Sequence, residues 1–170
     1  MRMFFRNRSR VLLGFFFLFS SATISIAQTV KPITEKGLDS LLSNRNGTML
    51  VLNIWATWCE PCKEEFPDLI KLSAKYKKKD VQFAAISVDY PDEVESKILP
   101  FIDSLHVPFV VYVADFPSQD SLINTINKEW SGGVPATVIY DRKGKRQQFL
   151  FGKQPYQKLK GAIDNLLRKK

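Results

Sequence analysis

Two cysteines separated by two residues lie directly between an apolar segment and a helical pattern, and this arrangement constrains the fold more than any other feature. The apolar segment, Met49 to Trp55, is long enough for a strand and has no polar face, which indicates a strand buried on both sides. Apolar residues spaced three and four apart then predict an amphipathic helix from about Glu60 to Lys77. Cys59 and Cys62 are therefore expected where the strand turns into the helix.

A cysteine at the start of a helix is in a favourable place for thiol chemistry. Unpaired backbone amides and the positive end of the helix dipole favour a thiolate at Cys59 over a thiol. Pro61 is tolerated in the first turn, and Cys62 lies about one turn away from Cys59. A thiolate attacks disulfides, so we expect Cys59 to form a mixed disulfide with a target and Cys62 to resolve it. This exchange needs no cofactor and no metal.

Other uses of a cysteine pair fit the sequence less well. A structural zinc site needs about four ligands, whereas the chain holds two cysteines and one histidine, His106. A haem attachment site needs a histidine after the second cysteine, and Lys63 stands there. A purely structural disulfide stays open as an alternative, although a bridge that closes so short a loop restrains the unfolded chain little.

Several motifs together resemble a known family. The run Trp58-Cys59-Glu60-Pro61-Cys62 resembles the active site of the thioredoxin superfamily. Residues around that run and in a later loop resemble the exported TlpA/ResA-like branch of this superfamily. They are Asn53, Trp55, Thr57, Glu65-Phe66-Pro67 and Gly133-Val134-Pro135. The resemblance covers roughly residues 35 to 168. It implies a thioredoxin-like α/β fold of three layers, α/β/α, with a central mixed sheet and a strand-helix element inserted between Pro91 and Asn127.

The resemblance also implies how a substrate is held. It places Val134 and Pro135 in a cis peptide against the cysteines, and X-Pro is the bond type for which the cis form costs little. The backbone of Val134 is then expected to pair with an extended substrate chain. Trp58 is expected to shield the site and contact substrates, and Pro61 is assigned to the same substrate-binding surface.

Two carboxylates are expected to adjust the thiols. Asn53 stands where cytoplasmic thioredoxins bury an aspartate, so we consider Glu65, three residues beyond Cys62, as a proton acceptor. A plain solvated helix carboxylate is the alternative. Glu60 between the cysteines opposes a second negative charge, which makes the pair a weaker oxidant and predicts a reductant of protein disulfides. Asp89 and His106 are predicted to cap helices or to face solvent, without a role.

The N-terminal segment has the three parts of a secretory signal. Basic residues without acids, an apolar core over 11–19 and small or polar residues over 20–27 predict cleavage before Gln28. An uncleaved membrane anchor is the alternative. The expected organisation is a signal peptide over 1–27 and a thioredoxin-like domain over 28–170. The protein is then expected in the periplasm or another extracytoplasmic space, with membrane contact only through an uncleaved N-terminal segment.

Charge and composition narrow the partners. The net charge of +8 falls to 21 basic against 17 acidic residues once the leader is set aside. This surplus is scattered and not interleaved with aromatic residues, so nucleic acid is not an expected partner. The expected partners are protein disulfides, with apocytochrome c as one candidate, and an upstream membrane thiol-reductant. Cytochrome c maturation or periplasmic redox homeostasis are the corresponding roles.

Two further functions are weighed against thiol-disulfide exchange. A peroxiredoxin-like peroxide reductase has the same fold, but its cysteine lies in a Pro-x-x-x-Thr/Ser-x-x-Cys frame, and here Leu52 and Ala56 occupy the proline and threonine places. A thioredoxin-fold binding or chaperone module for metalloprotein assembly is the other alternative, which an intact cysteine pair disfavours. Remaining patterns predict a lead-in and helix over 30–43, strands over 81–88, 109–113, 136–140 and 146–151, and helices over 92–105, 118–127 and 156–167.

Overall fold

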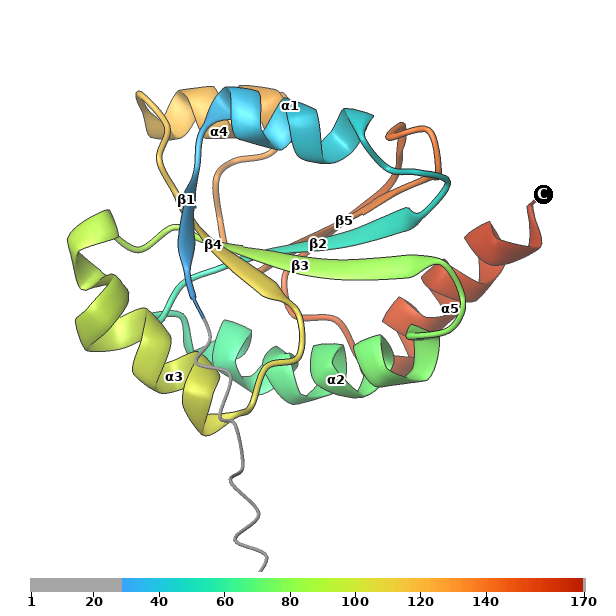
Figure 1. Cartoon of the computed structure of the whole chain (residues 1–170), viewed down its shortest axis with the longest axis horizontal. Helices are drawn as coiled ribbons and strands as arrows, with labels where there is room; N and C mark the ends of the chain where they lie inside the picture. The colour runs from blue at the N-terminus through green and yellow to red at the C-terminus, as the bar shows by residue number, and fades with distance from the viewer. Residues whose placement is uncertain (1–28, 170) are drawn as a thin grey trace, which may run out of the picture.

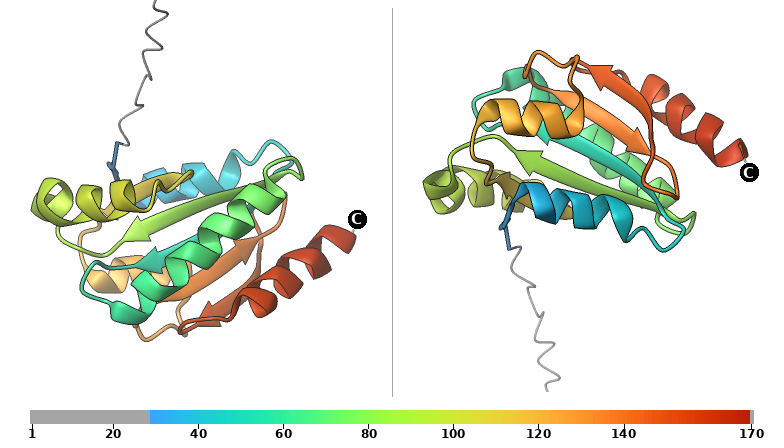
Figure 2. Two further views of the ribbon diagram at one scale, coloured as in Figure 1. Left: turned by 90° about the horizontal axis from the view of Figure 1, so that it is seen from below. Right: turned by 90° about the horizontal axis from the view of Figure 1, so that it is seen from above.

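The computed structural model describes residues 29–169 and has a sheet enclosed between two layers of helices (Figure 1). Within the described residues, two α-helices cover one face of the sheet and three cover the other, and the two views of Figure 2 show helices on both faces. The first layer contains α1 (Glu35–Ser43) and α4 (Gln119–Ile126), and the second contains α2 (Glu60–Tyr76), α3 (Leu99–Ser104) and α5 (Tyr156–Arg168). The three-layer α/β/α prediction is therefore confirmed.

The sheet is mixed and has the order β1-β4-β3-β2-β5-β6 within the described residues. The first four strands in that order are parallel, while β5 is antiparallel to β2 and β6 is antiparallel to β5. The strand of the predicted insertion between Pro91 and Asn127 is β4, which lies between β1 and β3 in the sheet. The strands are β1 (Lys31–Ile33), β2 (Met49–Trp55), β3 (Val81–Ser87), β4 (Val110–Ala114), β5 (Ala136–Tyr140) and β6 (Arg146–Phe151).

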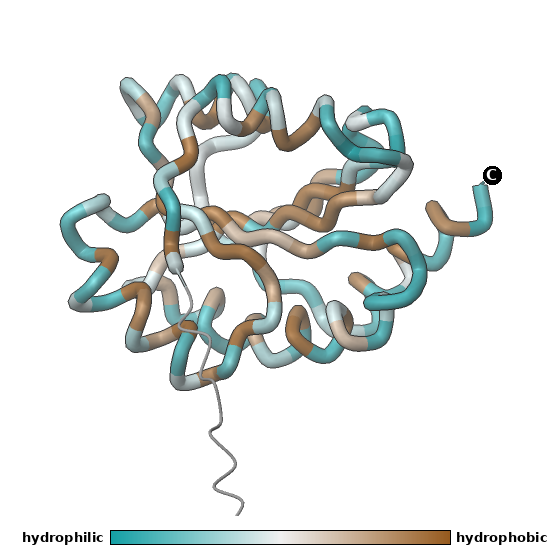
Figure 3. Tube along the Cα trace, viewed as in Figure 1, coloured by the Kyte–Doolittle hydropathy of each residue, from teal (hydrophilic) through white to brown (hydrophobic). Residues whose placement is uncertain are grey.

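Strand β2 is buried at every position because helices cover both of its faces. Side chains alternate along a strand, so Leu50 and Leu52 pack in the core beneath α1 and α4, whereas Val51 packs in the core beneath α2 and α5. Figure 3 shows the most hydrophobic stretches along the central strands. The loop that follows β2 therefore leaves the middle of the sheet at its carboxyl edge.

The prediction of a single helix over 92–105 is wrong. The chain instead forms a 3-10 turn at Pro91–Glu93, a π-helical turn at Val94–Ile98 and then α3. The N–H of Leu99 bonds to the carbonyl of Val94, five residues back. Pro100 has no N–H for an α-helical bond, and its ring would clash with the carbonyl four residues before it, so a wider turn fits here.

The lead-in before α1 contains a strand that the sequence pattern did not reveal. Residues Lys31–Ile33 form β1 and pair with β4 in parallel. The strand is three residues long, and only Ile33 is buried, so no alternation of apolar and polar residues is visible. Within residues 29–169, no helix combines the length and apolar character needed to cross a bilayer. The expected leader over 1–27 lies outside the described residues.

Candidate active site

The two cysteines lie where the spacing predicted, between the end of β2 and the first turn of α2. Cys59 is the N-cap of α2, with an extended backbone, and its Sγ accepts a hydrogen bond from the N–H of Cys62 at 3.3 Å. The two residues are joined by a disulfide, with 5.3 Å between their Cα atoms. A negative charge that forms on Cys59 Sγ therefore faces a backbone donor and the positive end of the helix dipole.

The pair is more buried than the sequence interpretation assumed. Cys59 is 5% exposed and Cys62 is 1% exposed, because both belong to a core cluster with Trp55 and Phe66. Attack on a target disulfide needs access to Cys59 Sγ, so this burial limits how a substrate can approach the thiol. Trp58, the residue before Cys59, is 66% exposed. Only Cys59 therefore offers surface for attack.

The loop before β5 lies against the same cluster. The Val134–Pro135 peptide is cis, as the resemblance implied, and Val134 packs on the cluster that contains the cysteines. Ala136, the first residue of β5, pairs with Ile54 near the end of β2. The indole N–H of Trp130 donates to the carbonyl of Gly133 at 2.8 Å and holds the loop. Among the described residues, the backbone of Val134 has no hydrogen-bond partner.

Glu65 is a buried carboxylate, so its interpretation as a solvated helix residue is wrong. It is 1% exposed and accepts hydrogen bonds from the Asn53 amide at 3.0 Å and from the Gln154 N–H at 2.7 Å. The same Asn53 amide also donates to Thr137. Burial raises the pKa of the Glu65 carboxyl, and the two hydrogen bonds oppose this shift in part. Asn53 thus acts as the donor that holds Glu65.

The residues between the cysteines lie on the surface. The side chain of Glu60 is 70% exposed and forms an ion pair with Lys63 at 2.6 Å, which offsets part of its negative charge. Pro61 lies in the first turn of α2 and is also exposed. Lys63, which stands directly after Cys62, is thus the ion-pair partner of the carboxylate that lies between the two cysteines in the chain.

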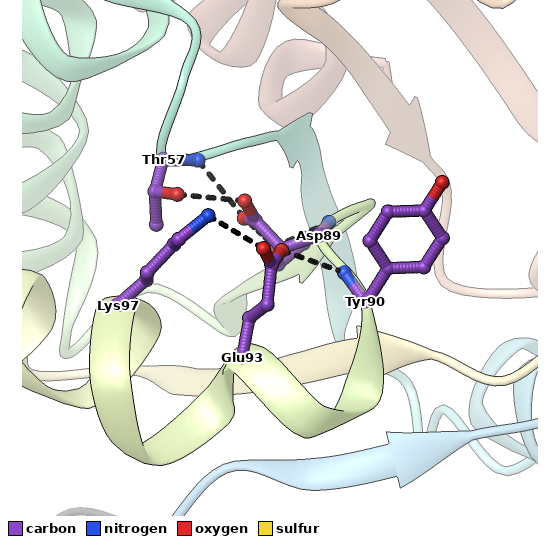
Figure 4. A network of polar contacts seen from close by, with 6 residues as sticks. Thr57, Asp89, Tyr90, Glu93 and Lys97 are labelled. Atoms are coloured by element: carbon purple, nitrogen blue, oxygen red, sulfur yellow. Dashed lines mark hydrogen bonds and ion pairs between the residues drawn. The ribbon is translucent and has the colours of Figure 1, made fainter.

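Asp89 was predicted to cap a helix or to face solvent, and this prediction is wrong. It is 3% exposed, and its carboxylate accepts from the N–H of Thr57 at 2.9 Å, from the Thr57 hydroxyl at 2.6 Å and from the Ser87 hydroxyl (Figure 4). Thr57 lies two residues before Cys59, so this bond ties the cysteine loop to the end of β3. The sequence did hold a signal for this contact, namely polar residues at the carboxyl end of a strand that neighbours β2 in parallel. His106 faces solvent, as expected.

The arrangement suits electron transfer through sulfur. Within residues 29–169, no group of three or more histidine, cysteine, aspartate or glutamate side chains is placed to hold a metal ion. Cys59 and Cys62 are bonded to each other at the N-terminus of a helix. Opening and closing this bridge moves two electrons to or from a partner thiol pair.

Comparison with known proteins decides the family. The family model described as Redoxin matches residues 27–148. The chain belongs to the Redoxin family. The thiol-disulfide oxidoreductase ResA of Geobacillus kaustophilus is 28% identical to this redoxin over 131 residues, which are 77% of this chain and 70% of the relative.

Two solved structures resemble this redoxin as well. A thioredoxin-related protein of Neisseria meningitidis serogroup B is 26% identical, with a TM-score of 0.60, over 73% of this chain and 87% of the other. A thiol:disulfide interchange protein of the thioredoxin family from Chlorobium tepidum has a TM-score of 0.62 at 21% identity, over 72% of this chain and 82% of the other, and shows the shared fold. This redoxin is thus a TlpA/ResA-like member of the thioredoxin superfamily and a thiol-disulfide oxidoreductase that carries the Cys59 and Cys62 pair.

Proposed function

We propose that this redoxin is an exported reductant of protein disulfides, with Cys59 as the attacking thiol and Cys62 as the resolving thiol. The observation that carries the assignment is the asymmetry of the pair: Cys59 caps the helix and keeps some exposure, whereas Cys62 is almost wholly buried. The Cys59 thiolate attacks one sulfur of a target disulfide, and the other target sulfur leaves as a thiolate. Cys62 then attacks Cys59 Sγ, releases the target as a dithiol and closes the bridge.

Glu65 is the proposed proton acceptor for Cys62 in the second step. The buried thiol of Cys62 must lose its proton before it attacks, and Glu65 lies one helical turn further along α2. Its raised pKa makes the carboxylate a better base than an exposed glutamate. Thiol titration of the reduced protein tests this role. Glu65→Gln is expected to move the titration curve of the thiols, and overlapping curves for the two proteins remove Glu65 from proton transfer.

The proposed substrate-binding surface lies around Cys59. The unpaired backbone of Val134 supports pairing with an extended polypeptide, as in strand addition. Pro135 holds this backbone beside the cluster that contains the thiols, and Trp58 and Pro61 provide exposed apolar surface on the other loop. With Trp58 in the loop before α2 and Pro61 in its first turn, a polypeptide that bears a disulfide therefore has both main-chain and side-chain contacts available to it.

The cellular setting is proposed from the N-terminal pattern. A basic start, an apolar core and small residues before Gln28 support export by a signal, with cleavage or with retention as an anchor. In that setting the oxidised protein needs electrons from an upstream membrane thiol-reductant, and apocytochrome c or misoxidised exported proteins are the candidate targets. An alkaline phosphatase fusion after residue 28, active only when exported because it needs its disulfides, tests the location.

The reduction potential of the pair tests the direction of electron flow. The protein beginning at Gln28 is equilibrated against glutathione or dithiothreitol buffers, and the fraction of bridged Cys59 and Cys62 is measured. A potential near that of thioredoxin, about −270 mV, supports a reductant, whereas one near that of DsbA, about −120 mV, reverses the proposed direction. Cys62→Ser is expected to accumulate a mixed disulfide with a target protein, and Cys59→Ser, the matched control, is expected to accumulate none.

A further inference from the structure

Two large aromatic side chains, one in the loop after β2 and one in the loop after β3, are left in solvent. Trp58 is 66% exposed and precedes Cys59, and Tyr90 is 74% exposed in the loop that follows β3. Aromatic side chains are the usual anchors of protein recognition because they offer a large, rigid apolar area. Trp58 is part of the proposed substrate surface, but Tyr90 has no place in the chemistry derived above.

The backbones of these two residues are linked through the residues that precede them. Trp58 directly follows Thr57, and Tyr90 directly follows Asp89, the two residues joined by hydrogen bonds at 2.6 and 2.9 Å. The N–H of Tyr90 also donates to the carboxylate of Glu93, which pairs with Lys97. Figure 4 shows the Tyr90 ring pointing away from this ion pair. The main chain of Tyr90 is thus restrained from two sides while its ring remains free to bind a partner.

The sheet order places Tyr90 across the active site from Val134. Strand β2, which leads into the cysteine loop, lies between β3, which leads into Tyr90, and β5, which begins after Val134. Because β5 is antiparallel to its neighbour, its start lies at the same edge as the ends of β2 and β3. Two strand spacings separate β3 from β5, about 10 Å, and an extended chain covers this distance in about three residues.

We propose that Trp58 and Tyr90 form an aromatic clamp for an apolar or aromatic side chain of the substrate polypeptide. In the substrate, the residue with this side chain is about three residues away from the residue that pairs with Val134, and the target cysteine lies between the two. The inference rests on the proposed function and adds a substrate class: disulfides of extended polypeptides with such a side chain near the cysteine. Small disulfides such as glutathione disulfide do not reach the clamp.

Peptide kinetics test the clamp. Disulfide-bonded peptides that carry either Tyr or Gly at each position within four residues of the target cysteine are offered to the reduced full chain. We expect the Tyr peptide to react about tenfold faster at one position about three residues from the Val134 contact. Tyr90→Ser is expected to abolish this preference, and Tyr90→Phe is expected to keep it. Val110→Ser, which removes another exposed apolar side chain at the start of β4, is the matched control and keeps the preference.

Two results separate recognition from chemistry. The rate with glutathione disulfide and the reduction potential are expected to be the same in Tyr90→Ser and the wild type. Equal rates for Tyr and Gly peptides at every position in the wild type, or an equal loss with peptides and glutathione disulfide in Tyr90→Ser, would overturn the clamp. If the protein is instead an oxidant, the proposed direction fails, and the same preference is read with the oxidised protein and the dithiol forms of the peptides.

Discussion

The Asp89 carboxylate is expected to hold the redox loop against the end of β3, and its replacement gives a measurable loss of stability. It accepts two hydrogen bonds from Thr57 and one from Ser87 while almost wholly buried. A hydrogen bond to a charged group contributes about 1.5–3 kcal/mol net. Asp89→Asn keeps an acceptor oxygen for the Thr57 N–H, and the Thr57 hydroxyl can accept from the new amide, but the substitution removes the charge that strengthens these hydrogen bonds, so the free energy of unfolding should fall by about 2 kcal/mol. Asp89→Ala removes every acceptor and should cost about 4 kcal/mol.

Urea unfolding of the oxidised protein, followed by tryptophan fluorescence, measures these losses. Asp92→Asn is the matched control, because it makes the same chemical change three residues away on an exposed side chain. Surface substitutions of this kind usually change stability by less than about 0.5 kcal/mol. If Asp89→Asn and Asp89→Ala both lie within that margin of Asp92→Asn, the carboxylate does not hold the loop and the reasoning is refuted.

Three further predictions concern charge and hydroxyl groups. Glu60→Gln removes a carboxylate beside the thiols and frees its partner Lys63, so the reduction potential of the cysteine pair should become about 7–20 mV more oxidising. Glu64→Gln, the matched control, removes another lysine-paired carboxylate on α2 and should leave the potential unchanged. An unchanged or more reducing potential in Glu60→Gln contradicts the prediction. Burial raises the pKa of Glu65 above its usual 4.5, so the stability that this group contributes is present below pH 4.5 and is lost as the pH rises through the pKa of the folded state. Glu65→Gln should therefore flatten the pH dependence of the urea midpoint. Parallel pH profiles for the variant and the wild type reject this prediction. The Tyr140 hydroxyl is buried without a hydrogen-bond partner among the described residues, so Tyr140→Phe should raise the free energy of unfolding in urea by about 1 kcal/mol. Tyr76→Phe removes a hydrogen bond to the Asp164 carboxylate and should lower the free energy of unfolding by a similar amount. Shifts of the same sign in the two variants contradict the prediction.

The sequence by itself determined the elements on either side of the thiol pair and the chemistry of the pair. Met49–Trp55 was predicted as a buried strand, and the helix after it was predicted to within one residue of its observed end at Tyr76. The hairpin of Ala136–Tyr140 with Arg146–Phe151 was predicted with its observed bounds. These features depend on neighbours close in the chain, because helix periodicity, N-capping and turn formation all act over a few residues.

The tertiary structure alone decided which polar groups around the thiols are buried. Asp89 and Glu65 look like ordinary surface carboxylates in the sequence, yet each is almost fully enclosed. Their partners lie far along the chain, with Thr57 32 residues from Asp89 and Gln154 89 residues from Glu65. No local pattern encodes such contacts, because burial depends on which strands become neighbours in the sheet. The thiol pair can thus be located from a short segment of sequence, whereas the groups that position it and surround it exist only once the sheet has assembled.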